Sequence, residues 1–404
     1  MRTEPSWRSW VTPSLLKDKP IHRWYYFPHS FTSELVHKLI EEWNLTSEDR
    51  LLDPFCGSGT TLVAAKEKGI PAKGYDLSPL AALTTNAKVA NYAVHDLKDI
   101  WRRLRKAIHP ECWNGASKPY PLLVRHALPG RLLGAFDSIA DQIRRLECTT
   151  TERQFFLLAL LGILPRYSRA VPTGGWLSWK HSGKRYTSIL DSLREQVRLM
   201  LEDVEACGSR KGGNWLAEVA DARCLPDSER AYSAIITSPP YPNRHDYTRV
   251  FGVELMFGFL NWNETKKLRY QSFHSHPEAH PKRPECEGYT QPSSLARTLR
   301  KIENAGEDKR IIRMLKGYFV DLYLCLKECR RVTKRRGKIA FVLGNAQYRG
   351  QVIPVDELTA EIGEQVGLRC DHLIAVRFRG NSAQQMGEFG RRPSRESIVV
   401  FGRR

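Results

Sequence analysis

A strand, a glycine turn and a helix follow one another between residues 51 and 66, and this segment constrains the fold more than any other part of the chain. Apolar residues lead to Asp53, and Gly57 and Gly59 then allow the backbone to turn sharply. An alanine-rich helix is expected to begin near Thr60. Because the free N–H groups of a helix N-terminus point toward whatever lies above such a turn, the segment predicts a ligand-binding strand-turn-helix of an α/β domain.

The surroundings of this turn narrow the kind of ligand. No Gly-Lys-Ser/Thr follows, so the turn is not a P-loop, and Leu62 stands where a dinucleotide-binding turn has its third glycine. Asp76 ends a second predicted strand 17 residues after Gly59, where an acid can accept hydrogen bonds from ribose hydroxyls. A glycine turn with such an acid suits a nicotinamide cofactor or S-adenosylmethionine.

A second motif, Ser238-Pro239-Pro240-Tyr241, comes directly after the apolar run 232–237. The two prolines make the turn rigid, and the serine hydroxyl and a turn carbonyl are closely spaced acceptors beside a flat ring. These groups match what is needed to hold a planar amino group still. A double-proline turn can also be only a loop stiffener, but together with the glycine turn it favours S-adenosylmethionine.

Together these segments resemble the amino-methyltransferases of DNA, which methylate exocyclic amines of cytosine or adenine. The resemblance extends to residues 27–31, 33–43 and 337–345, to the strand end at Asp221, and to residues 395–401. It covers most of the chain outside one long insertion. It implies an α/β fold, a Rossmann-like methyltransferase with a mostly parallel seven-stranded sheet whose last strand is antiparallel, and a helical insertion.

The resemblance also implies roles for individual residues. Ser238, Pro239, Pro240 and Tyr241 would hold the target base for direct methyl transfer without an enzyme nucleophile. The residues expected to bind S-adenosyl-L-methionine are Ser30, Phe31, Asp53, Pro54, Phe55, Gly57, Gly59, Thr60, Asp76, Leu77, Asp221 and Ala222. Serine before the two prolines favours N4 of cytosine, whereas aspartate or asparagine is more usual for N6 of adenine. The carbon-5 route is disfavoured because the chain has no Pro-Cys dipeptide.

The charge of the chain indicates a polyanionic partner, expected to be double-stranded DNA. There are 63 basic and 44 acidic side chains, a formal net charge of +19, and no acidic residue lies between positions 153 and 190. A glycine-hinged loop in this stretch is expected to contact DNA, or alternatively to be a solvated basic loop with its tryptophans packed beneath. Its residues are Arg166, Arg169, Trp176, Trp179 and Lys180, with Lys184 and Arg185 nearby.

A base in a duplex must leave the stack to reach such a turn. Arg244 or Tyr247 is expected at the rim of the base pocket, or alternatively Arg244 pairs with Asp246 to cap a helix.

Five regions are expected along the chain. Residues 1–96 form the cofactor-binding half, 97–205 a helical insertion for target recognition, 206–262 the catalytic strands, 263–310 a polar flap, and 311–404 the C-terminal part of the catalytic domain. The flap is the competing candidate for target recognition.

The remaining expectations concern location and partners. No stretch has the length of a membrane span or signal peptide, which predicts a cytoplasmic protein. No metal is expected, because His274, His276 and His280 lack the spacing of a zinc site. A role in restriction-modification or phage defence is expected, with a cognate restriction nuclease as a candidate partner; the oligomeric state is not predicted. The alternatives are an RNA or protein-glutamine methyltransferase, and a non-catalytic DNA-binding subunit, which the intact motifs disfavour.

Overall fold

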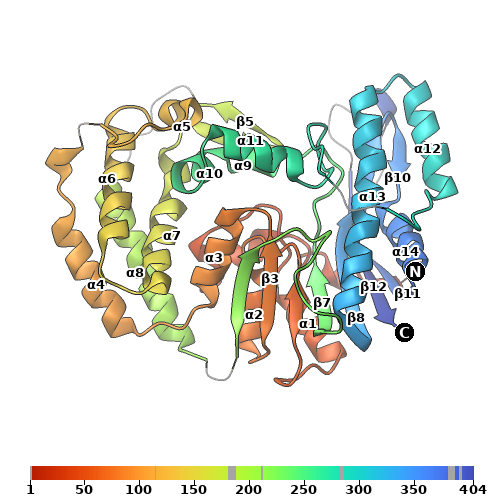
Figure 1. Cartoon of the computed structure of the whole chain (residues 1–404), viewed down its shortest axis with the longest axis horizontal. Helices are drawn as coiled ribbons and strands as arrows, with labels where there is room; N and C mark the ends of the chain where they lie inside the picture. Colours follow the sequence, from red (N-terminus) through yellow and green to blue (C-terminus); the bar gives the residue numbers. More distant parts are fainter. Residues whose placement is uncertain are drawn as a thin grey trace.

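An eight-stranded sheet forms the centre of the computed structural model, and helices cover both of its faces (Figure 1). The structure describes residues 2–113, 115–180, 188–210, 213–282, 286–380, 387–390 and 394–404. The strand order is β1-β11-β12-β8-β7-β2-β3-β6. The strands are β1 (Arg2–Thr3), β2 (Leu51–Asp53), β3 (Ala72–Asp76), β6 (Trp215–Val219), β7 (Tyr232–Thr237), β8 (Thr333–Gly344), β11 (Leu368–Arg379) and β12 (Ser394–Arg403).

The direction of the strands confirms the predicted fold class. Strands β6, β3, β2, β7 and β8 are parallel neighbours, and β12 is antiparallel to both β8 and β11. The number of strands was predicted one too low. Arg2 and Thr3 pair in parallel with Ile374 and Ala375 and add a short eighth strand. Two polar residues show no hydrophobic pattern, so the sequence did not predict this strand.

The parallel strands are buried on both faces, so their apolar residues form runs rather than alternating with polar ones. In β7, Ala234 and Ile236 belong to one core and Ile235 to the other. The first core is completed by α1 (Ser33–Glu42), α2 (Thr60–Glu67) and α3 (Pro79–Val89), and the second by α12 (Ser293–Asn304), α13 (Lys309–Val332) and α14 (Val355–Gln365). The result is a helix-sheet-helix sandwich.

Between α3 and β6 the chain forms a helical unit at one end of the sheet (Figure 1). Its helices are α4 (Val94–Ala107), α5 (Leu122–Ala127), α6 (Arg131–Arg145), α7 (Thr150–Tyr167) and α8 (Ile189–Cys207). The expected glycine-hinged loop is an antiparallel hairpin, in which β4 (Ala170–Thr173) pairs with β5 (Trp176–Trp179). The Gly174-Gly175 pair supplies its two-residue turn, because glycine readily adopts the positive φ that such turns need.

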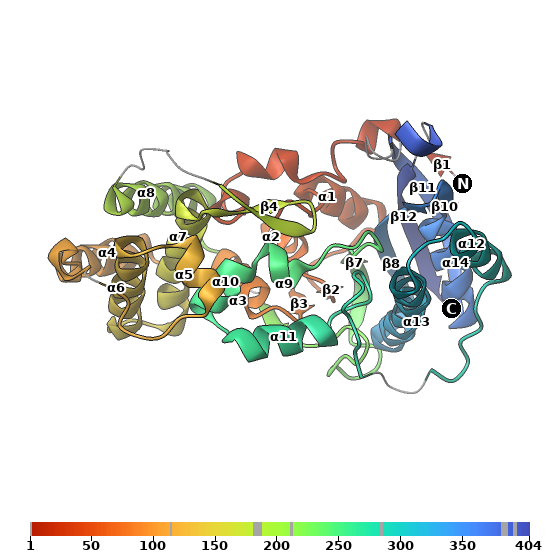
Figure 2. The ribbon, with the colours of Figure 1, turned by 90° about the horizontal axis from the view of Figure 1, so that it is seen from above.

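Three further helices, α9 (Tyr247–Val250), α10 (Gly252–Gly258) and α11 (Trp262–Gln271), lie over the ends of β2 and β3 (Figures 1 and 2). The segment expected to be a polar flap, residues 263–310, is helical over much of its length, since it contains α12 and most of α11. The missed signal is a capping box, in which Asn261 and Glu264 bond to each other's backbone N–H groups. The division of the chain into five regions stays a prediction.

Short elements complete the chain. They are the 3-10 helices η1 (Pro5–Trp7), η2 (Pro13–Lys17), η3 (His22–Trp24) and η4 (Pro110–Cys112), and a small hairpin of β9 (Ala346–Tyr348) and β10 (Gln351–Ile353). Among the helices that the structure describes, none is long and apolar enough to cross a membrane.

Candidate active site

A cavity, here called the strand-end cavity, opens at the carboxyl ends of β2, β3, β6 and β7, under α9 to α11. It holds about 950 Å³ of empty space, counting its open mouth. Open α/β sheets bind ligands at this edge, near the point where the strand order reverses between β2 and β7. Seven of the residues predicted to bind the cofactor line it, namely Pro54, Phe55, Gly57, Asp76, Leu77, Asp221 and Ala222.

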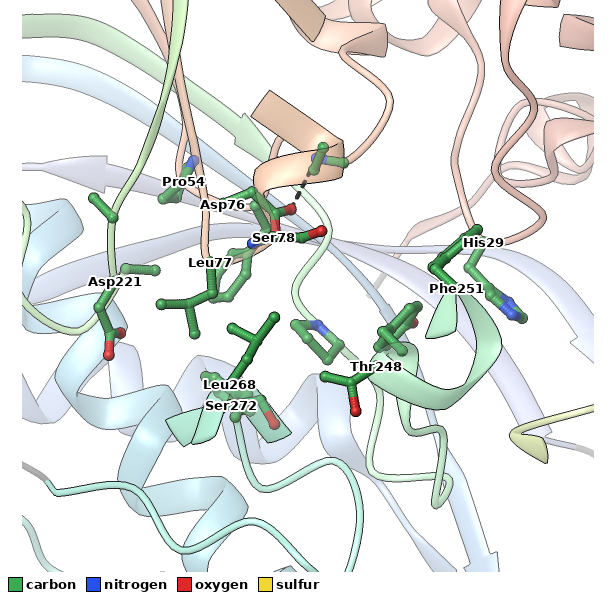
Figure 3. Close-up of a pocket in the computed structure, with 18 of the residues that line it drawn as sticks. His29, Pro54, Asp76, Leu77, Ser78, Asp221, Thr248, Phe251, Leu268 and Ser272 are labelled. Carbon is green, nitrogen blue, oxygen red and sulfur yellow. Dashed lines mark hydrogen bonds between the residues drawn. The ribbon is translucent and has the colours of Figure 1, made fainter. Parts of the chain in front are cut away.

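Asp76 lies near the middle of this cavity, with Asp221 on one side and His29 on the other (Figure 3). Its carboxylate accepts hydrogen bonds from the backbone N–H of Gly57 at 3.1 Å and of Ser78 at 2.9 Å. Burial nevertheless raises the pKa of Asp76 to about 6. Each carboxylate oxygen has a second lone pair, so Asp76 can still accept hydrogen bonds from two neighbouring hydroxyl groups of a ligand.

Asp221 is held by a buried chain of charges. Arg223, which is 4% exposed, donates to the Asp221 carboxylate from Nε at 2.9 Å and from Nη2 at 2.7 Å. Its Nη1 lies 3.2 Å from Asp321 of α13, and Asp321 also accepts from the His274 backbone N–H at 2.9 Å. This chain joins the cavity wall to α13 and to the segment after α11, so it fixes the direction in which Asp221 points.

Three of the predicted cofactor residues line neither cavity and contact other parts of the protein. Asp53 is 2% exposed and accepts hydrogen bonds from the Thr237 hydroxyl at 2.6 Å and the Thr61 hydroxyl at 2.7 Å. It therefore ties β2 to β7 and α2, and burial raises its pKa to about 6. Gly59 adopts a φ of 84° at the start of α2, and Thr60 lies 3.0 Å from Ser30, oxygen to oxygen.

A second cavity, here called the diproline cavity, adjoins the first and holds about 630 Å³ of empty space. Ser30 and Phe31 line this cavity and not the strand-end cavity. Its other lining residues are Val11, Pro13, Pro28, His29, Ser238, Pro239, Tyr241, Asn243, His245, Tyr247, Val342 and Glu396. The N-terminal segment thus packs beside the turn that ends β7.

The diproline turn, residues 238–241, is part of the wall between the two cavities. Ser238 lines both, together with His29 and Tyr247, whereas Pro240 faces the strand-end cavity and Pro239 and Tyr241 face the other. Within the part of the chain that the structure describes, the Ser238 hydroxyl has no hydrogen-bond partner. Ligands entering from the two sides can therefore meet at Ser238.

The Tyr241 ring packs against the backbone at the end of β8. A Cβ atom built on Gly344 would lie 2.8 Å from Cε2 and 2.9 Å from Cδ2 of Tyr241. Only glycine leaves room for the ring at this distance. The family resemblance includes this segment, residues 337–345, but gives no sign of the contact.

The residues predicted to bind DNA lie on the surface. Arg166, Arg169 and Lys180 are exposed, and Trp176 and Trp179 are 57% and 45% exposed. The alternative, in which the tryptophans pack beneath the loop, is therefore wrong. Lys184 and Arg185 lie outside the described residues.

The tip of the β4–β5 hairpin packs on the loop after the diproline turn, residues 242–246, here called the diproline loop. A Cβ atom on Gly175 would lie 2.8 Å from the carbonyl oxygen of Arg244, so the two backbones touch. The Arg249 guanidinium lies 4.2 Å from the centre of the Trp176 ring. The exposed aromatic side chain at position 176 is thus held beside the diproline loop.

Arg244 and Asp246 do not pair. Asp246 caps α9 by accepting from the backbone N–H groups of Thr248 and Arg249, and its ion pairs are with Arg249 at 3.1 Å and Arg269 at 2.8 Å. Arg244 is exposed, and its guanidinium lies 5.3 Å from the centre of the Tyr348 ring. The capping role of Asp246 was predicted with the wrong partner, because Arg269 comes from α11.

Much of the wall that covers the strand-end cavity escaped prediction. Thr248, Phe251, Leu268, Ser272 and Phe273 line it from α9 to α11 and the following segment (Figure 3). No local pattern distinguishes these residues from ordinary core residues. Among the described residues, no group of three or more His, Cys, Asp or Glu side chains is arranged to hold a metal ion.

Comparison with known proteins identifies relatives along nearly the whole chain. A family model for DNA methylases of the N6/N4 type matches residues 3–86. The Type II methyltransferase M.BsoBI of Geobacillus stearothermophilus is 27% identical over 457 aligned residues, which cover 99% of this chain and 89% of that protein. M.AvaI of a Nostoc strain, another Type II methyltransferase, is 28% identical, covering 95% of this chain and 87% of its own. The resemblance to the DNA amino-methyltransferases is confirmed.

Among solved structures, a geranyl diphosphate methyltransferase in complex with SAM matches with a TM-score of 0.35 and 9% identity, covering 98% of this chain and 96% of its own. The fold assignment depends on the strand order described above.

The strand-end cavity fits the cofactor of the DNA amino-methyltransferases, S-adenosylmethionine. Asp76 can accept from ribose hydroxyls, and Asp221 can accept from the adenine amine. Among the described lining residues, the only permanent cation is Arg223, whose guanidinium is committed to two carboxylates. Acids without an available cation suit a cofactor with a positive sulfonium centre and do not suit the diphosphate of a nicotinamide dinucleotide.

Proposed function

We propose that this protein transfers a methyl group from S-adenosylmethionine to the exocyclic N4 of a cytosine that has been flipped out of double-stranded DNA. The observation that carries this proposal is the position of the diproline turn between two cavities, with Ser238 facing both. A cofactor on one side and a base on the other would place the donor and the target amine at the same residue.

The cofactor supplies an electrophilic methyl group when it is bound. The Ser238 hydroxyl and the Pro239 carbonyl are suited to accept the two hydrogens of the target amine, which directs its lone pair out of the ring plane. The Tyr241 ring is suited to stack on the base, and Gly344 limits how far that ring can retreat. Because the two prolines keep the turn rigid, this geometry exists before the base arrives.

The choice of cytosine rests on Ser238, since serine at this position favours N4 of cytosine. The alternative is N6 of adenine, for which the same cavities and acceptors would serve. An RNA amine is the weaker alternative, because M.BsoBI and M.AvaI, which align with nearly the whole chain, are Type II methyltransferases.

The DNA is expected to lie across the exposed basic residues of the insertion. Arg166 lies in the last turn of α7, Arg169 and Lys180 flank the β4–β5 hairpin, and Trp176 of this hairpin lies against Arg249 of α9. Their contacts with phosphates would offset the cost of unstacking the target base, which is about a few kcal/mol. We expect the protein to act in restriction-modification with a cognate nuclease, inside the cytoplasm.

One experiment tests the proposal. The protein is incubated with labelled S-adenosylmethionine and, in parallel reactions, with duplex DNA of mixed sequence or with RNA, and the nucleosides are separated by mass. N4-methylcytosine is the expected product. N6-methyladenine would move the proposal to its alternative, and label in RNA but not in DNA would refute it.

A further inference from the structure

We infer that Glu396 is a further catalytic residue, whose carboxylate takes the proton that the target amine releases on methylation. The inference rests on the proposed function to the extent that an exocyclic amine is the acceptor at the diproline turn. It does not depend on which base carries that amine. The diproline turn does not itself supply such a proton acceptor, because Ser238 and Pro239 offer only neutral oxygens.

The register of the sheet places Glu396 next to the diproline turn. Glu396 of β12 pairs directly with Gly344 of β8 in the antiparallel ladder. Side chains of directly paired residues point to the same face of a sheet, with Cβ atoms about 4.5–5.5 Å apart. The missing Cβ of Gly344 points at the Tyr241 ring. Glu396 therefore extends toward the face on which Tyr241 packs.

The cavity confirms this direction. Glu396 lines the diproline cavity together with Ser238, Pro239 and Tyr241. Val342, two residues before Gly344, also lines it, as expected for the same face of β8. A base stacked on Tyr241 would therefore lie beside the carboxylate, with its amine at Ser238.

The charge of this cavity supports a proton acceptor. Glu396 is 3% exposed, and among the described lining residues it is the only carboxylate. Its partner across the ladder is Arg377 of β11, with Nη1 3.5 Å from the carboxylate. A neighbouring guanidinium favours the charged form of a buried carboxylate. Glu396 can therefore be deprotonated when the reaction begins, and a deprotonated carboxylate can accept a proton.

The other titratable groups among the described residues that line the cavity are His29, His245, Tyr241 and Tyr247. Burial lowers the pKa of His245, which favours its neutral form. The residues of β8 that face Glu396, Val342 and Gly344, are uncharged. Among the described residues, Arg377 and the two histidines can modulate the titration of Glu396.

Methyl transfer to the target amine releases one proton, and the Glu396 carboxylate can accept it. The lone pair of the amine nitrogen forms the new N–C bond as the S–C bond breaks, and the sulfur keeps the electron pair of the broken bond as a neutral thioether. The nitrogen then carries two hydrogens, the methyl group and a positive charge. One N–H proton passes to the Glu396 carboxylate, which leaves a neutral methylamine and a carboxylic acid that later loses its proton to solvent.

An ion pair between Glu396 and Arg377 could alternatively only stabilise the sheet, and a matched pair of variants separates the two roles. Glu396→Gln keeps the shape of the side chain and removes its basicity. Arg377→Gln breaks the same ion pair and keeps the carboxylate. Single-turnover methyl transfer is measured from pH 5.5 to 9 with saturating cofactor and duplex DNA, alongside the dissociation constants of both ligands.

We expect Glu396→Gln to slow the transfer at least 30-fold at pH 8 and to change neither dissociation constant more than threefold. The acidic limb of the wild-type rate profile should disappear in this variant. Arg377→Gln should shift that limb to higher pH and recover most of the rate at pH 9. Glu396→Asp, a second carboxylate variant, should keep the limb at a reduced rate.

A transfer rate in Glu396→Gln within threefold of wild type would overturn the inference. So would equal losses in the Glu396→Gln and Arg377→Gln variants at every pH, since that result assigns both residues to the ion pair. Nucleoside analysis of the wild-type reaction, run in parallel, reports on the proposed function by itself: absence of any methylated amine there would refute that function, whereas a normal product with an unaffected variant would refute only the role of Glu396.

Discussion

Replacing Gly344 by alanine should displace the Tyr241 ring and slow methyl transfer without weakening cofactor binding. The new Cβ would lie 2.8 Å from Cε2 and 2.9 Å from Cδ2 of the ring. Carbon atoms in contact prefer about 3.5–4.0 Å, so the ring must move by about 0.6–1.2 Å. A displacement of about 1 Å at a reacting group can cost about 100-fold in rate, equivalent to about 2.7 kcal/mol of barrier.

The assay is single-turnover transfer to duplex DNA at saturating cofactor, together with a cofactor titration and thermal unfolding. We expect a rate about 100-fold lower, because the ring lines the diproline cavity, and an unchanged cofactor dissociation constant, because it does not line the strand-end cavity. Overpacking of this kind costs about 1–3 kcal/mol of folding free energy, so the variant should still fold.

Two other glycines provide matched controls. A Cβ on Gly74 would lie 2.8 Å from the Cβ of Cys56, beneath the glycine turn, so Gly74→Ala should weaken cofactor binding instead. A Cβ on Gly162 of α7 would lie 2.9 Å from the Trp24 carbonyl oxygen, away from both cavities, and Gly162→Ala should lower only stability. A folded Gly344→Ala protein that transfers methyl groups at the wild-type rate would refute the reasoning.

Four further outcomes are expected. Tyr241→Ala should weaken binding of a flipped base by about 1–3 kcal/mol and slow transfer, as measured with an oligonucleotide carrying a mismatched target, while Tyr241→Phe keeps most of both; a large loss of cofactor affinity would contradict this assignment. Burial raises the pKa of Asp76 to about 6, so its carboxylate is fully charged only above that pH. Calorimetry should therefore show cofactor affinity rising between about pH 5 and 7. A similar rise in the Asp76→Asn variant would show that Asp76 does not bind the ribose. Asp321→Ala leaves buried Arg223 with one carboxylate fewer and should cost about 3–5 kcal/mol of unfolding free energy in denaturant titrations; a loss below 1 kcal/mol would argue against the buried chain. Neutralising Arg166 and Arg169 together should make DNA binding less dependent on salt, and an unchanged slope of affinity against salt would place the DNA elsewhere.

The parts of the site that were predictable all depend on short-range patterns. The run 232–237 forms β7 with the same bounds, and the glycine turn begins α2 at Thr60, as its residues indicate. Asp76 ends β3, and parallel strands that end in turn residues bring their carboxyl ends to one edge. For this reason seven of the residues predicted to bind the cofactor line one cavity, and their role there stays a prediction.

The contacts that complete the site join segments far apart in the chain, and no local pattern encodes them. The position of Glu396 beside Tyr241 requires β12 to insert between β8 and β11 in one register, and a shift of one residue would turn its side chain to the other face. The tip of the β4–β5 hairpin contacts the diproline loop because the helical unit, which carries this hairpin between α7 and α8, packs at one end of the sheet.

Local residue chemistry thus predicted the fold class, the resemblance to DNA amino-methyltransferases and the two turns of the candidate site, because glycine, proline and strand-ending acids restrict the backbone wherever they occur. The buried chain from Asp221 to His274, the division of the site into two cavities and the proton acceptor proposed at Glu396 came from tertiary packing. These features depend on ion pairs and backbone hydrogen bonds between segments that are far apart in the sequence. Such contacts form only when the whole chain reaches its lowest free energy, so no local sequence pattern predicts them.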